Sequence, residues 1–364
     1  MDYQELLQDF FRRLLYPGLP FLICLNCILA LDKIAPQLGL LDRPDDRKQH
    51  AGTVPLVGGP AMFLAIFASV LMLEFDYNVL VFLALGVVLM LLGILDDLYD
   101  LRASYRVLVQ AAVATLMAFH GGVQIHEIGN IIGQGTVNLT GTVAVIFTVI
   151  CTIGVINAVN MIDGVDGLAG SILLVSFLAM AWLALQARDF HNAKMLVIFG
   201  GALVGFLCFN ARIIVSKARI FMGDSGSMLM GFIMVWYFIS LTQGEDAPVS
   251  AITAGWIFGL PLIDTVSVMV GRILKRESPF KAGRDHLHHR LMDNGFGVNA
   301  TVLIMLSIHL FFVMTGIFFN GVTKIEPLMF WGFVLIVIAH HFLTPKLLNS
   351  DNLQQPKGSA DKQN

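Results

Sequence analysis

Two aspartates stand side by side at the end of a long apolar run. The segment GVVLMLLGILDD ends in Asp96 and Asp97, and Asp100 follows one helical turn after Asp96. On a helix Asp96 and Asp100 would share a face. A charge at membrane depth costs about 2.5–3.5 kcal/mol, and adjacent carboxylates also repel each other. A divalent cation would offset both costs, and oxygen ligands favour Mg²⁺ or Mn²⁺; a solvated helix end is the alternative.

A second polar stretch, NAVNMIDGVDGLAG, also follows an apolar run. Asn157 and Asn160 lie three residues apart, as do Asp163 and Asp166, so each pair could share a helix face. The glycines permit a close backbone approach or a break in the helix. Uncharged amides both donate and accept hydrogen bonds, which suits a nucleotide. The stretch therefore predicts a nucleotide-binding wall, with a capped glycine-rich turn as the alternative.

A third segment, FMGDSGS, places Asp224 among glycines and serines. Ser225 could cap the following helix, and the free N–H groups at a helix start attract anions. The segment therefore predicts a site for a phosphate, a metal ion or both. A plain helix cap is the alternative.

Basic residues and histidines gather in two further segments. Lys48 belongs to the cluster RKQH, which precedes TVPLVGG, and could grip a diphosphate. Residues 272–298 hold six Lys and Arg together with His286, His288 and His289. Histidine near neutral pH can donate to phosphate oxygens or exchange a proton. The alternative is a solvated basic loop on the cytoplasmic side of a membrane.

The elements that must position these residues are membrane helices. Of the 364 residues, 56% are hydrophobic and 13% are charged, whereas a soluble domain carries about 25% charged residues. Apolar stretches able to cross ~30 Å of hydrocarbon recur along the chain. We therefore expect an all-α, polytopic membrane protein with eleven spans. Their expected centres are Ile23, Ile66, Leu85, Ala112, Ile146, Val175, Phe199, Ile233, Ile257, Leu310 and Val334.

The distribution of Lys and Arg predicts the orientation of these spans. One set of loops and the tail 345–364 carry most of the 23 Lys and Arg, which places them in the cytoplasm, the C-terminus with them and the N-terminus in the periplasm. We expect residues 1–344 to form one catalytic domain and the polar tail to be disordered. Every polar cluster lies on the same predicted side. The cytoplasmic loops are 42–55, 96–106, 157–167, 210–224 and 272–298.

Four motifs together resemble a known enzyme superfamily. GILDDLYDL, NAVNMIDGVDGLAG, FMGDSGS and HLHHRL are similar, in order and rough spacing, to those of the polyprenyl-phosphate N-acetylhexosamine-1-phosphate transferases. Within it, GLLDRPDDRKQHAGTVPLVGG and HLHHRL resemble the bacterial branch that transfers GlcNAc 1-phosphate to undecaprenyl phosphate. The resemblance implies an enzyme of the bacterial inner membrane whose active site faces the cytoplasm.

The resemblance also implies a reaction. The phosphate of undecaprenyl phosphate attacks the sugar-bearing phosphorus of UDP-GlcNAc, and UMP leaves. The product, undecaprenyl-diphosphate-GlcNAc, would start O-antigen or enterobacterial common antigen synthesis. The family uses Mg²⁺, with Mn²⁺ as a substitute, and is sensitive to tunicamycin.

Roles for individual residues follow from the same resemblance. The resemblance assigns no role to Asn210, because the segment between it and Asp224 is longer than in the related MurNAc-pentapeptide enzymes, and Arg212 or Arg219 could act there instead. The resemblance implies metal ligands at Asp224 and Asp97, catalytic roles for Asp96, Asp97, Asp163 and Asp166, and substrate contacts from Lys48, Asn157, Asn160, Phe221, His286, His288 and His289, with Phe221 stacking on uracil.

Other functions stay open at this point. The same chemistry could use another UDP-HexNAc or UDP-MurNAc-pentapeptide. An ion-coupled transporter would place its polar residues nearer the bilayer midplane, and a prenyltransferase would need a second acidic motif like DDLYD. The expected partners are UDP-GlcNAc, undecaprenyl phosphate and the lipid bilayer, without nucleic acid, and the chain could act as a monomer or a homodimer.

Overall fold

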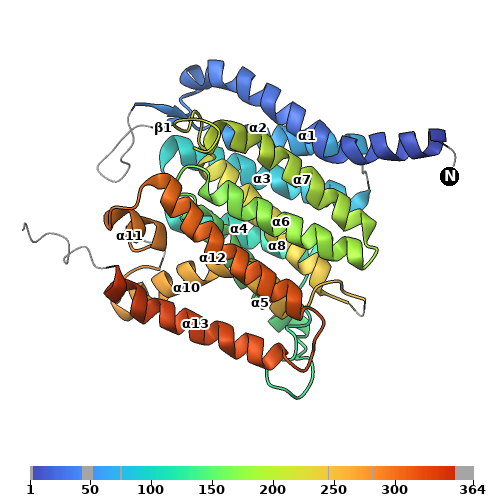
Figure 1. The fold of residues 1–364 in the computed structure, drawn as a ribbon, viewed down its shortest axis with the longest axis vertical. Helices are drawn as coiled ribbons and strands as arrows, with labels where there is room; N and C mark the ends of the chain where they lie inside the picture. Colours follow the sequence, from blue (N-terminus) through green and yellow to red (C-terminus); the bar gives the residue numbers. More distant parts are fainter. Residues whose placement is uncertain (1–2, 43–51, 74–75, 245, 280–282, 349–364) are drawn as a thin grey trace, which may run out of the picture.

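The computed structural model describes residues 3–42, 52–73, 76–244, 246–279 and 283–348 (Figure 1), with side chains described from Leu14 onward. Helices dominate this part of the chain, and one short ribbon joins α1 to α2. The elements are α1 (Tyr3–Leu38), β1 (Leu41–Asp42), β2 (Val54–Pro55), α2 (Gly58–Leu73), α3 (Tyr77–Tyr99), α4 (Ala103–His120), α5 (Gly141–Ile162), α6 (Leu168–Gln186), α7 (Phe190–Asn210), α8 (Gly223–Thr242), α9 (Ala251–Ile257), α10 (Gly259–Leu274), α11 (Leu287–Asp293), α12 (Val298–Phe319) and α13 (Glu326–Leu347).

The prediction of an all-α, polytopic membrane protein is confirmed in its main features. Each of the expected centres lies within a helix. Within the described ranges, eight helices are long and apolar enough to cross a membrane, and the bent pair α9–α10 would make nine. Helix α2 is apolar but shorter. The count of eleven spans and the orientation stay predictions.

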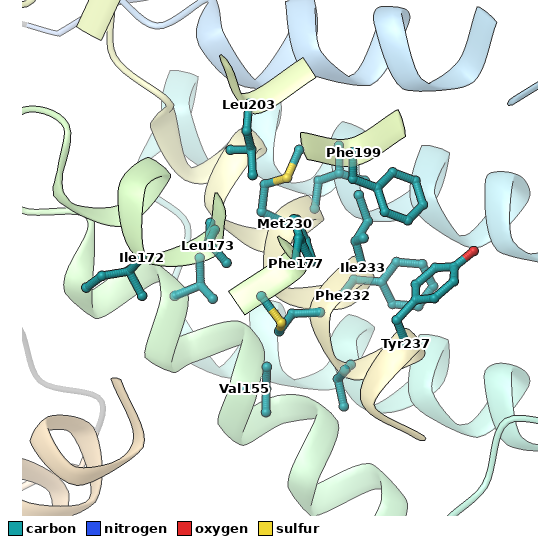
Figure 2. Packing of buried hydrophobic residues seen from close by; sticks show 14 of the residues in the cluster. Val155, Ile172, Leu173, Phe177, Phe199, Leu203, Met230, Phe232, Ile233 and Tyr237 are labelled. Carbon is teal, nitrogen blue, oxygen red and sulfur yellow. The ribbon is translucent and has the colours of Figure 1, made fainter. Parts of the chain in front are cut away.

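Helix α8 lies at the centre of the bundle. It packs against α2, α3 and α5, and almost all of its residues are buried. Figure 2 shows its aromatic and aliphatic side chains among those of α6 and α7. Phe82 of α3 contacts Phe232 and Tyr237 of α8 as well as Phe199 of α7. Helices α1 and α13 run along opposite edges of the bundle (Figure 1).

Glycines let three helices approach α8 very closely. A Cβ on Gly93 of α3 would lie 2.2 Å from Ser225, and one on Gly231 would lie 2.6 Å from Ile156 of α5. A Cβ on Gly59 of α2 would meet Gly226 at 2.3 Å. Small residues are the usual means of close packing between helices in a membrane. These contacts set where the ends of α3 and α5 lie relative to the start of α8.

The polar loops meet at one end of the bundle. The ribbon pairs Leu41 with Pro55, and the Phe221 N–H donates to the Pro55 carbonyl at 2.9 Å. The ribbon and α11 lie at the same end in Figure 1. The predicted tail begins inside α13, which continues to Leu347, and residues beyond 348 lie outside the described part.

Candidate active site

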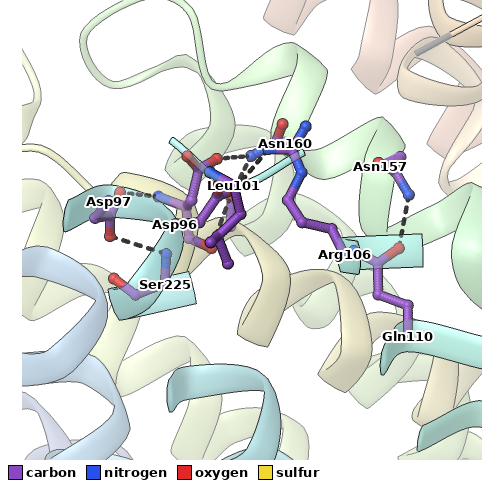
Figure 3. Close-up of polar contacts among 10 residues, drawn as sticks. Asp96, Asp97, Leu101, Arg106, Gln110, Asn157, Asn160 and Ser225 are labelled. Atoms are coloured by element: carbon purple, nitrogen blue, oxygen red, sulfur yellow. Dashed lines mark hydrogen bonds and ion pairs between the residues drawn. The ribbon is translucent and has the colours of Figure 1, made fainter. Parts of the chain in front are cut away.

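The start of α8 is capped by a carboxylate from another helix. Met222 at the N-cap position has no side-chain cap bond. Asp97, one turn beyond Gly93 on α3, instead accepts hydrogen bonds from the amides of Asp224 at 2.7 Å and Ser225 at 3.1 Å (Figure 3). The idea that Ser225 caps this helix is therefore wrong, because Asp97 already accepts the amide donors.

Asp224 meets an amide from α5. The side-chain nitrogen of Asn160 donates to the Asp224 carboxylate and, at 2.9 Å, to the hydroxyl of Ser227. Because the nitrogen of Asn160 is used in this way, its carbonyl oxygen is oriented away from Asp224 and can accept a hydrogen bond or bind a cation. The NAVN segment of α5 and the FMGDSGS segment at the start of α8 therefore meet at this end of the bundle.

The turn after α5 carries a third carboxylate. Helix α5 ends at Ile162, so Asp163 and Asp166 lie in a turn and do not share a helix face as we expected. Burial and the neighbouring carboxylates of Asp224 and Asp97 raise the pKa of Asp163 to about 7. The carboxylates of Asp97, Asp163 and Asp224 therefore repel one another, which concentrates negative charge at this end of the bundle.

Asp166 belongs to a separate set of contacts in the same turn. Its carboxylate accepts a bond from Arg212 Nε at 2.6 Å. Asn210 ties the turn to the next loop, since its oxygen accepts from the Gly167 amide at 2.7 Å and its nitrogen donates to the Ile220 carbonyl at 2.9 Å. Asn210 therefore positions the backbone, and Arg212 of the 211–222 loop brings a positive charge to residues 163–167, the acidic turn.

Asp96 faces a different group from Asp97. It is buried and accepts from Arg106 at 2.6 Å and from the Leu101 amide at 2.8 Å. Asp100 follows the end of α3 with φ 49°, so it does not share a helix face with Asp96 as we expected.

Asn157 lies one turn before Asn160 on α5, and its side-chain nitrogen donates to Gln110 of α4 at 2.9 Å (Figure 3).

Residues 286–289, the histidine segment, are anchored by a buried carboxylate that was not predicted from the sequence. Asp264 of α10 contacts His286 Nδ1 at 2.8 Å and accepts from the Leu287 amide at 2.9 Å. A carboxylate in this position holds a proton on Nδ1 and fixes the orientation of the ring. The signal was a lone acidic residue within the apolar run FGLPLIDTVSVMV.

His288 brings the histidine segment onto the acidic turn. A Cβ on Gly164 would lie only 2.4 Å from His288 Nε2, so the ring rests against the turn that carries Asp163 and Asp166. Burial lowers the pKa of His288 to about 3, and burial and the charge of Arg284 lower that of His289 to about 4. Both rings are therefore neutral near pH 7, so they can offer N–H donors to a phosphate but no charge.

Two comparisons with known proteins bear on this arrangement. Residues 79–242 match the family model described as "Glycosyl transferase family 4". The chain is 36% identical over 319 residues to an undecaprenyl-phosphate alpha-N-acetylglucosaminyl 1-phosphate transferase of Haemophilus influenzae, covering 87% of this chain and 89% of that protein. This chain belongs to the undecaprenyl-phosphate alpha-N-acetylglucosaminyl 1-phosphate transferase family. Proteins of the same name from Yersinia pestis and Escherichia coli K12 are 33% and 35% identical, over 88% and 76% of this chain and 88% and 75% of theirs.

The glycosyl transferase family 4 match spans α3 to α8. It therefore includes the carboxylates of Asp97, Asp163 and Asp224 but not Asp264 or the histidine segment. The resemblance inferred from the motifs is confirmed at the level of the family. The roles of the individual residues stay predictions.

Of the remaining predicted site residues, the structure describes Phe221 but not Lys48. Phe221 precedes α8 and is held through its backbone, since its carbonyl accepts from the Gly58 amide at 3.0 Å. Lys48 lies outside the described residues. Arg212 was a candidate from the sequence, but its pairing with Asp166 was not predicted, and neither was that of Arg106 with Asp96. The separation of these partners along the chain carries no local pattern.

The donor set at the start of α8 fits a hard divalent cation. Asp97, Asp163 and Asp224 supply only oxygen ligands, and burial together with the neighbouring carboxylates raises the pKa of Asp163, as expected where several carboxylates lie close together. Across the described part of the chain, no three His, Cys, Asp or Glu side chains form a ready-made metal site. Mg²⁺ commonly uses one or two carboxylates and completes its coordination with water and substrate phosphates, so this cluster fits a cation that binds with the substrate.

Proposed function

We propose that this chain transfers GlcNAc 1-phosphate from UDP-GlcNAc to undecaprenyl phosphate. A phosphate oxygen of the lipid forms a bond to the sugar-bearing phosphorus, and the bond from that phosphorus to the bridging oxygen breaks. UMP leaves with that oxygen and its electron pair. The observation that carries the proposal is the meeting of Asp97, Asp163, Asn160 and Asp224 at the ends of α3, α5 and α8, in a chain at least 33% identical to transferases with this name.

The chemistry requires two phosphates of like charge to approach each other. Mg²⁺, bound with Asp224 and Asp97 as its protein ligands, would supply positive charge to the UDP diphosphate. The lipid phosphate is already an anion, so no strong general base is needed. The main task of the protein is to hold the two phosphates in line and to keep water away from the reacting phosphorus.

The other side chains have separate tasks in this proposal. Asn160 holds Asp224 in place and presents its amide oxygen to the donor nucleotide. Arg212, paired with Asp166, contributes positive charge beside the turn. His288 and His289 donate N–H groups to phosphate or sugar oxygens as neutral rings, and Phe221 stacks on uracil. Asp96, which is paired with Arg106, fixes the start of α4 and does not bind the metal.

We place this end of the bundle at the cytoplasmic face of a bacterial inner membrane, with eleven spans and a periplasmic N-terminus. The support is the excess of Lys and Arg in the loops at this end. A cysteine introduced at Ile213, whose side chain is 85% exposed, should react with a membrane-impermeant maleimide in inside-out vesicles and not in intact spheroplasts. The opposite pattern would reverse the orientation. A detergent-solubilised particle with the mass of one chain would favour the monomer over the homodimer.

The transferase assay compares three donors in parallel. Purified protein with undecaprenyl phosphate should release UMP from UDP-GlcNAc in the presence of Mg²⁺ or Mn²⁺, and much more slowly from UDP-GalNAc or UDP-MurNAc-pentapeptide. Tunicamycin should inhibit this release. Full turnover in excess chelator would remove the metal from the proposal. UMP release from UDP-MurNAc-pentapeptide and from neither of the other donors would show that UDP-MurNAc-pentapeptide is the donor in place of UDP-GlcNAc.

A further inference from the structure

A polar contact inside the apolar core joins three helices where α9 meets α10. The hydroxyl of Ser176 on α6 donates to the Ile257 carbonyl at 3.1 Å, and its oxygen lies 3.1 Å from His309 Nε2 on α12. All three residues are fully buried. Because the single hydroxyl proton goes to the carbonyl, the network assigns the donor to His309 Nε2–H.

The sequence explains why the Ile257 carbonyl needs an outside donor. In a continuous helix this carbonyl would accept from the amide of residue 261, which is a proline and has no N–H. The chain bends by 83° between α9 and α10 at this point. An unsatisfied backbone carbonyl is costly in a membrane interior, so such breaks occur where neighbouring helices provide a donor. Ser176 is that donor.

Helix α12 forms a fitted support for the break. His309, Phe312 and Gly316 lie on one face at spacings of three and four residues. A Cβ on Gly259, the first residue of α10, would lie 2.9 Å from the Phe312 ring, and one on Gly316 would lie 3.0 Å from the side chain of Trp256. The two arms of the bend are therefore both in tight contact with α12.

The arm beyond the break carries Asp264. This residue lies about one helical turn after Pro261, and its carboxylate holds both His286 Nδ1 and the Leu287 amide. The direction of α10 thus decides where the histidine segment lies relative to the acidic turn. We infer that Ser176 and His309 are positioning residues that fix the α9–α10 break, so that Asp264 presents His286 to the reacting phosphates. Only the part of this inference that concerns the phosphates rests on the proposed function.

Hydrogen–deuterium exchange gives a readout that does not depend on activity. In lipid nanodiscs, Ser176→Ala and His309→Leu should each speed exchange of the Leu287 amide about three- to tenfold, because one buried membrane hydrogen bond has a modest net effect. Asp264→Ala provides the benchmark for loss of the acceptor. The same variants should lower kcat for UMP release by a similar factor while the KM for UDP-GlcNAc changes little. Ser176→Thr keeps the hydroxyl and should leave the Leu287 exchange rate and kcat close to their wild-type values.

Ser69 offers a matched control. It is also fully buried in an apolar helix, α2, and its hydroxyl has no hydrogen-bond partner among the described residues. Ser69→Ala should change neither exchange nor kcat. Unchanged Leu287 exchange in Ser176→Ala would overturn the inference, as would faster exchange spread equally over α6 and α8. If the wild-type protein releases no UMP but exchange responds as expected, the positioning role stands and the proposed function fails.

Discussion

Replacement of Gly164 by alanine tests whether the histidine segment must rest on the acidic turn. A Cβ at this position would lie 2.4 Å from His288 Nε2 and 3.1 Å from two ring carbons. Ordinary contact needs about 3.5 Å, so the ring must move by about 1 Å. His288 is only 1% exposed, and the nearby Asp264 contacts hold the start of α11, so the shift must displace the whole segment. The backbone of Gly164 is not in the left-handed region, so alanine adds no strain of its own.

A displacement of about 1 Å near reacting groups can cost about 100-fold in rate. We therefore expect Gly164→Ala to lower kcat for UMP release by about that factor with a small change in thermal stability. Gly154→Ala is the matched control, because Gly154 lies within α5, the helix that precedes this turn, with nothing within 4 Å of the added Cβ. It should retain full activity, since alanine is favoured over glycine in a helix. Activity of Gly164→Ala above half of the wild-type rate would refute the contact between the histidine segment and the turn.

Three further substitutions test other parts of the site. Asp224→Asn should lower UMP release at least 100-fold while the protein still folds, and near-normal turnover would remove Asp224 from the metal site. Gly93→Ala should lower both stability and activity, because its Cβ would lie 2.2 Å from Ser225; Gly86→Ala, whose Cβ would meet its nearest atom at 3.5 Å, is the control on the same helix, and equal melting temperatures would contradict the close contact. The pKa of His288 is about 3 in the folded protein and 6.5 in the unfolded chain, so below pH 6.5 the unfolded chain binds the extra proton and stability falls, by about 2 kcal/mol at pH 5. His288→Gln should therefore show a smaller loss of melting temperature between pH 7 and pH 5 than the wild type, and an equal loss would contradict the buried neutral ring.

The sequence predicts the helices of this protein better than their breaks. Apolar length is a local property, so each expected centre lies in a helix. The end of α5 at Ile162 depended on the glycines of DGVDG, and the expected shared face of Asp163 and Asp166 was wrong because the helix stops before them. The break at Phe258 had a signal in Gly259 and Pro261, yet the prediction treated this region as one span.

The partners of the site residues were harder to predict than the residues themselves. Asp97 and Asp224 are separated by 127 positions along the chain, and no local pattern states that one caps the helix of the other. Their meeting depends on the packing of α3 against α8. Asp264 was missed because a single acid in an apolar run gives no indication of which segment it holds.

The position of α8 explains why the carboxylates keep their spacing. Gly59, Gly93 and Gly231 bring α2, α3 and α5 into backbone contact with this helix, and small residues at such contacts leave little freedom for sliding. The distance between Asp97 and Asp224 is therefore set in the apolar interior. The loops at this end are held mainly by single polar contacts such as that of Arg212 with Asp166. Substitutions in these loops can therefore move the loop side chains while Asp97 and Asp224 keep their spacing.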